Sequence, residues 1–340
     1  MIGCIASRVA VCLMAAGVAD AQETAQHSRP ARSGQTSITT LPSRPQPGSI
    51  VRVAVVGSQE QSDPIVGVSG SMAGEPLHFM SATGGTWRAI GGVPVDASDS
   101  VVVRAILTHV SGRLDTVLAK VTLPRPPATT AGRRRQLSVS SKFTQPPDAA
   151  TEARISRESA RARAVGRLSH DTAPLWTARF LRPRESAITS QFGSGRLFNG
   201  SVTSRHLGVD FRGAVGEPVH AANRGVVALV DHFFLAGGVV YIDHGGGLVT
   251  GYFHLSRTIV AAGDTVERGQ KIGLVGASGR VTGPHLHWSA RYGEHAINPL
   301  DLIGLETEWY SGVSRSADSL DASAVRRPVG SRTAAGASRD

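Results

Sequence analysis

Four histidines and one aspartate stand at spacings that could serve chemistry. They are His206 and Asp210 in HLGVD, His254 in GYFHLS, and His285 and His287 in GPHLHW. In an extended strand, residues separated by an even number of positions point to the same face, and neighbours two positions apart lie about 6 to 7 Å from each other. Each pair therefore addresses one site. Two such imidazoles can be two metal ligands, one ligand with one acid or base, or a chance pair.

A catalytic zinc ion needs three protein ligands of nitrogen and oxygen type and leaves a fourth position for water. The histidines and aspartate named above exceed that need. The surplus imidazoles can act as acid or base near a water whose pKa the metal lowers to about 7. Thiolate ligands are excluded, because the two cysteines, Cys4 and Cys12, lie in a segment expected to be removed.

Residues 176–304 must position these side chains, and their pattern is that of short strands. Runs such as GVVALVD, GVVYIDHG and LVTGYFHL are rich in β-branched and aromatic residues, and glycine-rich corners separate them. We expect a compact antiparallel sheet or a barrel-like domain. Residues 48–124 show a second β pattern with hairpin-like spacing, which predicts a small immunoglobulin-like β-sandwich without the cysteine and tryptophan of that fold.

The N-terminal residues 1–21 read as a secretory signal peptide, with Arg8, an apolar run and small residues before Gln22. The run of about 11 residues is too short to span a bilayer, which takes roughly 20, and no later stretch comes close. We expect export to the periplasm or cell envelope, or secretion. Residues 22–47 and 305–340 are poor in apolar side chains and are predicted to be a disordered leader and tail.

Residues 125–175 form a basic connecting region. It carries ten of the Lys and Arg side chains against four Asp and Glu, which gives this region +6 of the chain's net charge of +10. Asp148 is a plausible N-cap for a helix over 148–168. The charge suits either a solvated linker or contact with an anionic envelope polymer, whereas nothing in the chain resembles a nucleic-acid-binding motif.

The order H-x-x-x-D, from His206 to Asp210, and then H-x-H, from His285 to His287, resembles the signature of the M23 family of zinc metallopeptidases, the LytM and lysostaphin type of cell-wall endopeptidase. Flanking segments between Ser190 and Leu302 also resemble the landmarks of that domain, in order. They include SQFGSGRLFNG, RHLGVDFRGAVGEPVHAANRGVV, IDHGGGLVTGYFHLS, VAAGDTVERGQKIGLVGASGRVTGPHLHW and INPLDL.

The resemblance implies that His206, Asp210 and His287 bind Zn²⁺, and that His254 and His285 form a non-ligand catalytic pair. A zinc-activated water would then hydrolyse a peptide bond in the cross-links or stem peptides of peptidoglycan. Which imidazole is the general base stays open, as does the bond: D-Ala to diaminopimelate, a glycine bridge or another. Some relatives that cut glycine bridges carry a tyrosine ahead of the first histidine, and RLFNGSVTSR has none.

Two other readings of the sequence involve no catalysis. Members of the family that have lost ligands act as activators or cell-wall-binding regulators of other hydrolases, and this chain retains every ligand type and both extra histidines. The segment VAAGDTVERGQKIG also resembles the hairpin of lipoyl and biotinyl carrier domains. Those domains need a lysine at the hairpin tip, whereas Lys271 has an ordinary strand context, so the similarity indicates shared β architecture.

Overall fold

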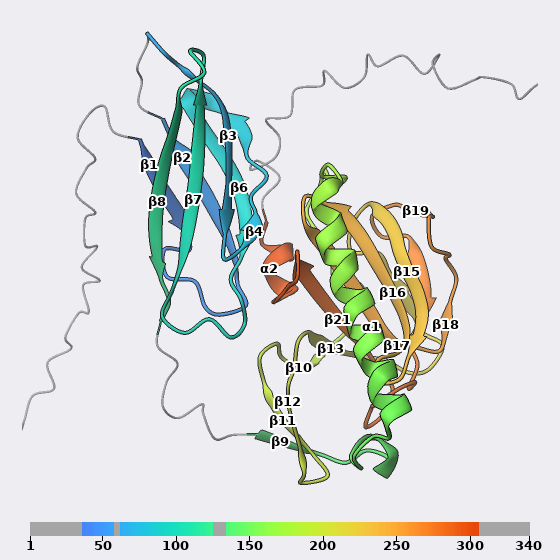
Figure 1. Cartoon of the computed structure of the whole chain (residues 1–340). Coiled ribbons are helices and arrows are strands. Elements are labelled where there is room, and N and C mark those ends of the chain that lie inside the picture. The colour runs from blue at the N-terminus through green and yellow to red at the C-terminus, as the bar shows by residue number, and fades with distance from the viewer. Residues whose placement is uncertain (1–35, 58–61, 125–133, 306–340) are drawn as a thin grey trace, which may run out of the picture.

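The computed structural model describes residues 36–57, 62–124 and 134–305. The predicted signal peptide, most of the predicted leader, the first residues of the basic region and the tail lie outside the described residues. Within them the chain is mainly β, with antiparallel sheets and one long helix, as the sequence predicts. Figure 1 shows two bodies that lie side by side, the N-terminal one in blue and the C-terminal one in green to red.

The N-terminal body is a sandwich of two four-stranded sheets. The first contains β1 (Ser37–Leu41), β2 (Ile50–Val56), β6 (Thr86–Gly92) and β5 (Met80–Ala82); the second contains β4 (Glu75–Pro76), β3 (Ile65–Met72), β7 (Ser100–His109) and β8 (Leu114–Thr122). A short turn of helix, η1 (Thr83–Gly85), precedes β6. Alternate residues such as Val51 and Val53 of β2 meet Val101 and Val103 of β7 in the core, as the period of two in a half-buried strand requires.

Strand β1 corrects one prediction. The sequence indicates a disordered leader as far as residue 47, but residues 37–41 pair with β2 along their whole length. This segment, SITTL, contains β-branched side chains that favour strands, and the Ile38 side chain packs against the sandwich core. The average composition of residues 22–47 does not indicate so short a strand. The strand forms by pairing with β2, which lies outside that segment.

The C-terminal body is built on an eight-stranded antiparallel sheet. Its order is β10 (Ile188–Ser190), β13 (Val209–Arg212), β21 (His285–Tyr292), β17 (Leu248–Leu255), β16 (Gly237–Gly245), β15 (Gly225–Phe233) and β19 (Thr265–Val266), with β22 (His295–Ile297) also on β21. A smaller sheet joins β14 (Pro218–His220), β20 (Lys271–Leu274) and β18 (Arg257–Thr258). The core of the C-terminal body contains the fully buried side chains of Trp288, Tyr252 and Phe211.

The expected helix is present as α1 (Ala149–Leu168), and the Asp148 side chain accepts a hydrogen bond from Thr151 N at 2.7 Å, which satisfies one of the free N–H groups of the first turn. Ala162 and Val165 pack with residues of β15, β16 and β17, so α1 covers the large sheet (Figure 1). Short helical turns η2 (Ser141–Phe143), η3 (Ser169–Asp171) and α2 (Leu300–Ile303) complete the helices. No helix in the described ranges has the length and apolar composition to cross a membrane.

Part of the basic region is a strand of the C-terminal body. Strand β9 (Arg134–Leu137) pairs in parallel with β11 (Gly195–Phe198), which pairs antiparallel with β12 (Val202–Arg205). The Asn199 side chain fixes the continuation of β9, since it accepts from Val139 N at 2.9 Å and donates to Val139 O at 2.8 Å. The connecting region is therefore held beside the loops that precede β13.

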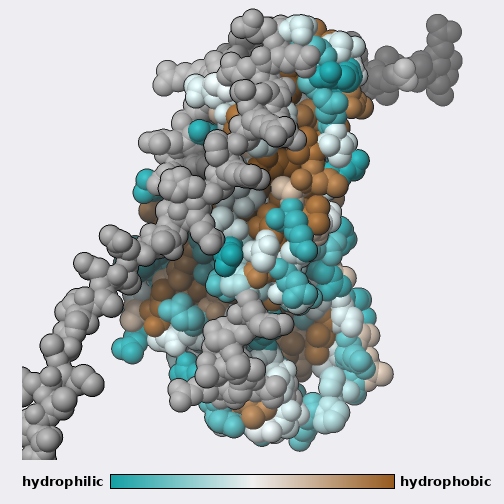
Figure 2. All heavy atoms as spheres, turned by 90° about the vertical axis from the view of Figure 1, so that its left-hand side faces the viewer, coloured by the Kyte–Doolittle hydropathy of each residue, from teal (hydrophilic) through white to brown (hydrophobic). Residues whose placement is uncertain are grey.

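The two bodies share an apolar contact. Ile50 and Ile90 of the sandwich belong to the same buried cluster as Tyr292 and Ile297 of the C-terminal body, and the Tyr292 hydroxyl donates to Pro76 O at 2.6 Å. Elsewhere on the surface, hydrophobic and hydrophilic side chains are interspersed, as Figure 2 shows for one face. The sandwich is therefore packed against the end of β21 that lies away from its two histidines.

Candidate metal centre and active site

Three predicted ligand residues meet at one point. His206 Nε2 lies 2.9 Å from Asp210 Oδ1 and 2.9 Å from His287 Nδ1, and His287 Nδ1 lies 2.8 Å from Asp210 Oδ1. All three residues are buried, and among the described residues they form the only group of three or more His, Cys, Asp or Glu placed to hold a metal ion. The H-x-x-x-D and H-x-H segments, which are far apart in the sequence, therefore lie together in the structure.

Strand register brings these groups together. Asp210 of β13 is directly opposite His287 of β21, and directly opposite residues in an antiparallel pair have side chains on the same face about 5 Å apart. His206 lies between β12 and β13, and its backbone N–H donates to Ser194 O at 2.9 Å. The short stretch from His206 to Asp210 thus delivers its two side chains to the position occupied by His287.

The chemistry of the donor set fits a cation. His206 Nδ1 lies 2.8 Å from Gln191 O, and because a carbonyl only accepts, the proton of the neutral ring is on Nδ1. His206 Nε2 and Asp210 Oδ1 therefore present lone pairs to each other, which is repulsive unless a proton or metal ion lies between them. Two imidazole nitrogens and one carboxylate oxygen form a set that suits Zn²⁺.

The carboxylate of Asp210 is also held from outside this group. Arg196 Nη2 of β11 donates to Asp210 Oδ2 at 2.5 Å and to Ser190 Oγ at 3.1 Å. Burial on its own raises the pKa of Asp210, but when a proton lies between the carboxylate and the facing nitrogens of His206 and His287, the hydrogen bonds from these rings outweigh burial and hold the pKa well below its usual range. Asp210 is therefore ionised, as a metal ligand must be.

The two predicted non-ligand histidines lie beside this group. His285 Nε2 is 3.6 Å from Asp210 Oδ1, and the ring centroids of His254 and His285 are 4.9 Å apart. Both rings face a carbonyl with Nδ1, at 2.9 Å for His285 and Gly283 O and at 2.8 Å for His254 and Ser278 O. In the neutral rings the proton is then on Nδ1, so each Nε2 is an acceptor.

His254 has an uncommon backbone conformation. Its φ angle is +63°, a left-handed region that non-glycine residues rarely occupy and that is enriched at functional sites. The backbone N–H of His254 donates to Ala236 O at 2.9 Å, and this bond holds the conformation. Burial, followed by the neighbouring charges of His285 and His287, lowers the pKa of His254 well below 6.5.

Several residues around the centre carry no signal in the sequence. Phe253 stacks on the His287 ring with centroids 5.2 Å apart and an interplanar angle of 12°, which fixes the orientation of that ring. The contact of Arg196 with Asp210 is evident only in the structure, because it depends on how β11 folds back. Another buried histidine, His244, lies apart from the centre and bonds Arg224 O at 2.7 Å and Thr250 Oγ1 at 2.8 Å. Asn199 contacts the connecting region, where its side chain donates to Val139 O.

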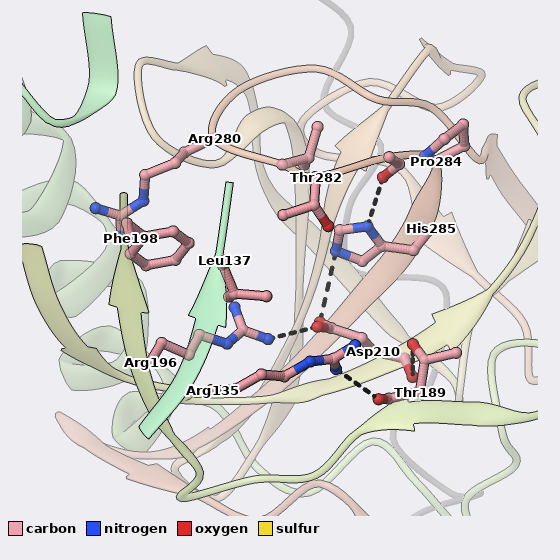
Figure 3. Close-up of a pocket in the computed structure, with 12 residues that line it drawn as sticks. Arg135, Leu137, Thr189, Arg196, Phe198, Asp210, Arg280, Thr282, Pro284 and His285 are labelled. Carbon is pink, nitrogen blue, oxygen red and sulfur yellow. Dashed lines mark hydrogen bonds and ion pairs between the residues drawn. The ribbon is translucent and has the colours of Figure 1, made fainter. Parts of the chain in front are cut away.

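A pocket of about 190 Å³ opens beside Asp210 and His285, as Figure 3 shows. Strands β9 and β11 supply one wall and the loop before β21 supplies the other. No residue of the described sandwich lines this pocket. Asp210 and His285 are therefore accessible from this pocket.

Comparison with known proteins gives a consistent picture. Residues 204–299 match the model of Peptidase family M23. The chain is 46% identical over 104 residues to peptidoglycan DD-endopeptidase ShyA of Vibrio cholerae, a match that covers 30% of this chain and 24% of ShyA. It is 40% identical over 97 residues to DD-carboxypeptidase/endopeptidase Mpg of Neisseria gonorrhoeae, covering 28% of this chain and 22% of Mpg. The chain thus matches about a quarter of the length of each relative.

One solved structure is similar over both bodies. A Pseudomonas aeruginosa protein described as a peptidase M23 superposes with a TM-score of 0.55 and 24% identity, covering 77% of this chain and 96% of that one. At this identity the likeness concerns the fold. The combination of a sandwich with the sheet that carries the histidines is therefore an arrangement known from another protein.

Proposed function

Since residues 204–299 form a domain of peptidase family M23, we propose that the protein is an exported zinc metalloendopeptidase that hydrolyses peptide bonds of peptidoglycan in the cell envelope. The observation that carries the proposal is the convergence of His206, Asp210 and His287 within 2.9 Å of one another, with His254 and His285 beside them. A metal-binding role alone does not require the last two imidazoles.

His206, Asp210 and His287 would hold the zinc ion through Nε2, Oδ1 and Nδ1 respectively. When bound, zinc lowers the pKa of water to about 7 and polarises carbonyl oxygens. Asp210 supplies one negative charge to the set, and Arg196 and Phe253 keep the carboxylate and the His287 ring in place. Such supporting contacts commonly change metal affinity by about 10- to 100-fold when they are lost.

The positioning of the attacking water and the proton transfers are assigned to the two other histidines. We propose that His285 Nε2 accepts a proton from the attacking water. His285 then delivers this proton to the leaving amine when the carbon–nitrogen bond breaks. His254 Nε2, which is also an acceptor in the neutral ring, would accept the other hydrogen bond of the attacking water and hold that water in place. Both rings are oriented for this by their Nδ1–H bonds to Gly283 O and Ser278 O.

The bond we propose is the D,D-peptide bond of cross-links between D-alanine and diaminopimelate. Support comes from the relatives named as DD-endopeptidases and from the absence of a tyrosine in residues 196–205. The alternative, a non-catalytic activator or wall-binding regulator, is disfavoured because the complete set of ligands and both further histidines converge at one point.

The test is incubation of the purified protein with intact sacculi, with and without a chelator, followed by mass spectrometry of the released muropeptides. We expect loss of cross-linked dimers that the chelator abolishes and added zinc restores. A zinc-loaded protein that releases nothing, together with an equally silent fragment of residues 134–305, would exclude the peptidase and favour the regulator.

A further inference from the structure

The pocket beside the metal centre contains an unusual concentration of positive charge. Its lining includes Arg135 of β9, Arg196 of β11 and Arg280 of the loop before β21, whereas Asp210 is its only acidic residue. In Figure 3, Arg135 and Arg196 extend from strands β9 and β11, and Arg280 reaches across from the loop so that its guanidinium group lies over Phe198 of β11. Three guanidinium groups thus line one hollow that adjoins the reacting centre.

Two of these three charges have no carboxylate partner in the part of the chain that the structure describes. Arg196 is paired with Asp210, which the proposed metal would also engage. Arg135 donates to the neutral carbonyl Thr189 O at 3.0 Å, and Arg280 lies over the Phe198 ring with its guanidinium carbon 4.2 Å from the centroid. Neither has a carboxylate within ion-pair distance among the described residues.

The polar capacity of this cluster is also incompletely used. Arg196 Nε is buried and has no hydrogen-bond partner among the described residues. The Arg280 side chain contacts an aromatic face, and its guanidinium N–H groups have no acceptor among the residues that the structure describes. Burial, and then the nearby charge of Arg196, lowers the pKa of Arg280.

A cluster of guanidinium groups in a hollow, two of them without a described carboxylate partner, is matched best by a planar anion. Arginine presents a rigid fork of N–H donors that binds carboxylates in bidentate fashion, and these charge-assisted bonds are stronger than neutral ones. The volume of about 190 Å³ is suited to one such group with part of its residue. The pocket shares Asp210 and His285 with the centre, so the anion must be close to the scissile bond.

We propose that Arg135 and Arg280 bind a free carboxylate of the substrate next to the bond that is cut, and so select peptides that carry this charge. The inference rests on the proposed function. In a D,D cross-link, that carboxylate belongs to the diaminopimelate centre whose amine is released. Arg135 then makes the connecting region part of the substrate groove, although it lies outside the matched residues 204–299.

The test measures binding, which does not depend on turnover. The probe is the uncross-linked tripeptide L-Ala-D-Glu-diaminopimelate, prepared with the carboxyl at the D-centre either free or amidated, and titrated calorimetrically into the zinc-loaded full chain. We expect the free form to bind roughly 10- to 100-fold more tightly, as charge-assisted hydrogen bonds imply. Arg280→Gln and Arg135→Gln should each reduce this ratio severalfold or more.

Arg224→Gln is the matched control, because it removes the same charge from an exposed arginine whose partner is Glu267, next to β15 and away from the pocket. It should leave the ratio unchanged. Equal binding of the two tripeptides by the unaltered protein overturns the inference, as does a ratio that survives both pocket substitutions in folded protein. Discrimination between the tripeptides without cleavage of cross-linked dimers would instead contradict the proposed function and support the inference.

Discussion

At the scale of residues, the centre is organised by which nitrogen of each histidine the backbone holds. His206, His254 and His285 each face a carbonyl with Nδ1, and each is thereby left with Nε2 toward the centre. His287 differs, since its Nδ1 is the atom near Asp210. These backbone contacts fix tautomer and ring direction before any ligand arrives, which is how outer contacts prepare a metal site.

The non-ligand role of His254 can be tested by His254→Asn. Asparagine tolerates the left-handed backbone of this position better than alanine does, so the change removes the imidazole with little strain. We expect zinc content to stay at the level of the unaltered protein, while hydrolysis of cross-linked muropeptides falls by at least about 100-fold, the usual contribution of a positioned acid or base.

The control is His232→Ala, which removes an exposed histidine of the same body and should leave both quantities unchanged. Zinc content is measured by elemental analysis after gel filtration. Loss of zinc from His254→Asn, with its fold intact, would place His254 among the ligands.

The residues that the sequence alone could predict are those with a short-range pattern. A spacing of two along a strand is enough to place His285 and His287 on one face. Arg196 and Phe253 are different, because their contacts with Asp210 and His287 depend on how β11 folds back and on which residue of β17 lies opposite β21. Neither can be deduced from local periodicity.

At the scale of elements, strand register decides the site. Asp210 lies opposite His287 across β13 and β21, and Phe253 lies opposite His287 across β17 and β21. Side chains alternate along a strand, so a slip of one residue would turn the ligands to the other face. The sequence predicted the sheet in outline, but β9 was not foreseen, since it forms only by pairing with β11.

Strand β16 should make the stability of the fold sensitive to acid through His244. Burial lowers the pKa of His244 to about 4, against about 6.5 in the unfolded chain. Between these values the unfolded state binds a proton that the folded state does not. Stability is therefore complete above pH 6.5 and declines as the pH falls toward 4, by about 2 to 3 kcal/mol at pH 4.5.

Urea unfolding of metal-free protein at pH 7 and pH 4.5 measures this effect, and His244→Gln isolates it from the other titrating groups. The substituted protein should lose about 2 to 3 kcal/mol less between the two pH values than the unaltered protein does. An identical loss in both proteins would show that His244 contributes nothing to acid sensitivity.

The anchoring of β9 can be tested by Asn199→Gly. Asn199 has a φ angle of +47°, which glycine adopts freely, so the change removes the two bonds to Val139 while preserving the turn. We expect hydrogen exchange at Val139 and the β9 amides to accelerate roughly tenfold, from the loss of about 1 kcal/mol or more.

Ser201→Gly, a change at an exposed turn residue of the same loop, should leave exchange in β9 unaltered and serves as the control. Unchanged exchange in Asn199→Gly would mean that backbone pairing with β11 alone holds β9.

At the scale of the whole molecule, the sandwich supports the C-terminal body rather than covering its centre. Ile50 and Ile90 pack into the same cluster as Tyr292 and Ile297, and Glu75 accepts from Glu294 N at 2.8 Å. The pocket lining contains no described sandwich residue. The sequence could not predict this shared core. The apolar residues of each segment fit the strand pattern of that segment, and nothing in the pattern shows that they also contact the other body.

Removal of the sandwich should therefore destabilise the C-terminal body. A fragment of residues 134–305 loses the burial provided by Ile50 and Ile90, each worth about 1.5–3 kcal/mol. We expect its thermal midpoint, measured by calorimetry, to lie roughly 10 °C below that of the corresponding transition in the full chain. Equal midpoints would show that the two bodies are energetically independent.

The division of roles between ligands and catalytic histidines is the central claim, and zinc content measured beside hydrolysis in His206→Ala and His285→Ala tests it most directly. Removal of His206 should abolish both the bound zinc and the cleavage of cross-linked muropeptides, because it takes away a ligand. Removal of His285 should leave one zinc per chain and abolish cleavage. Release of the metal from His285→Ala, or full cleavage without His285, would contradict the assignment.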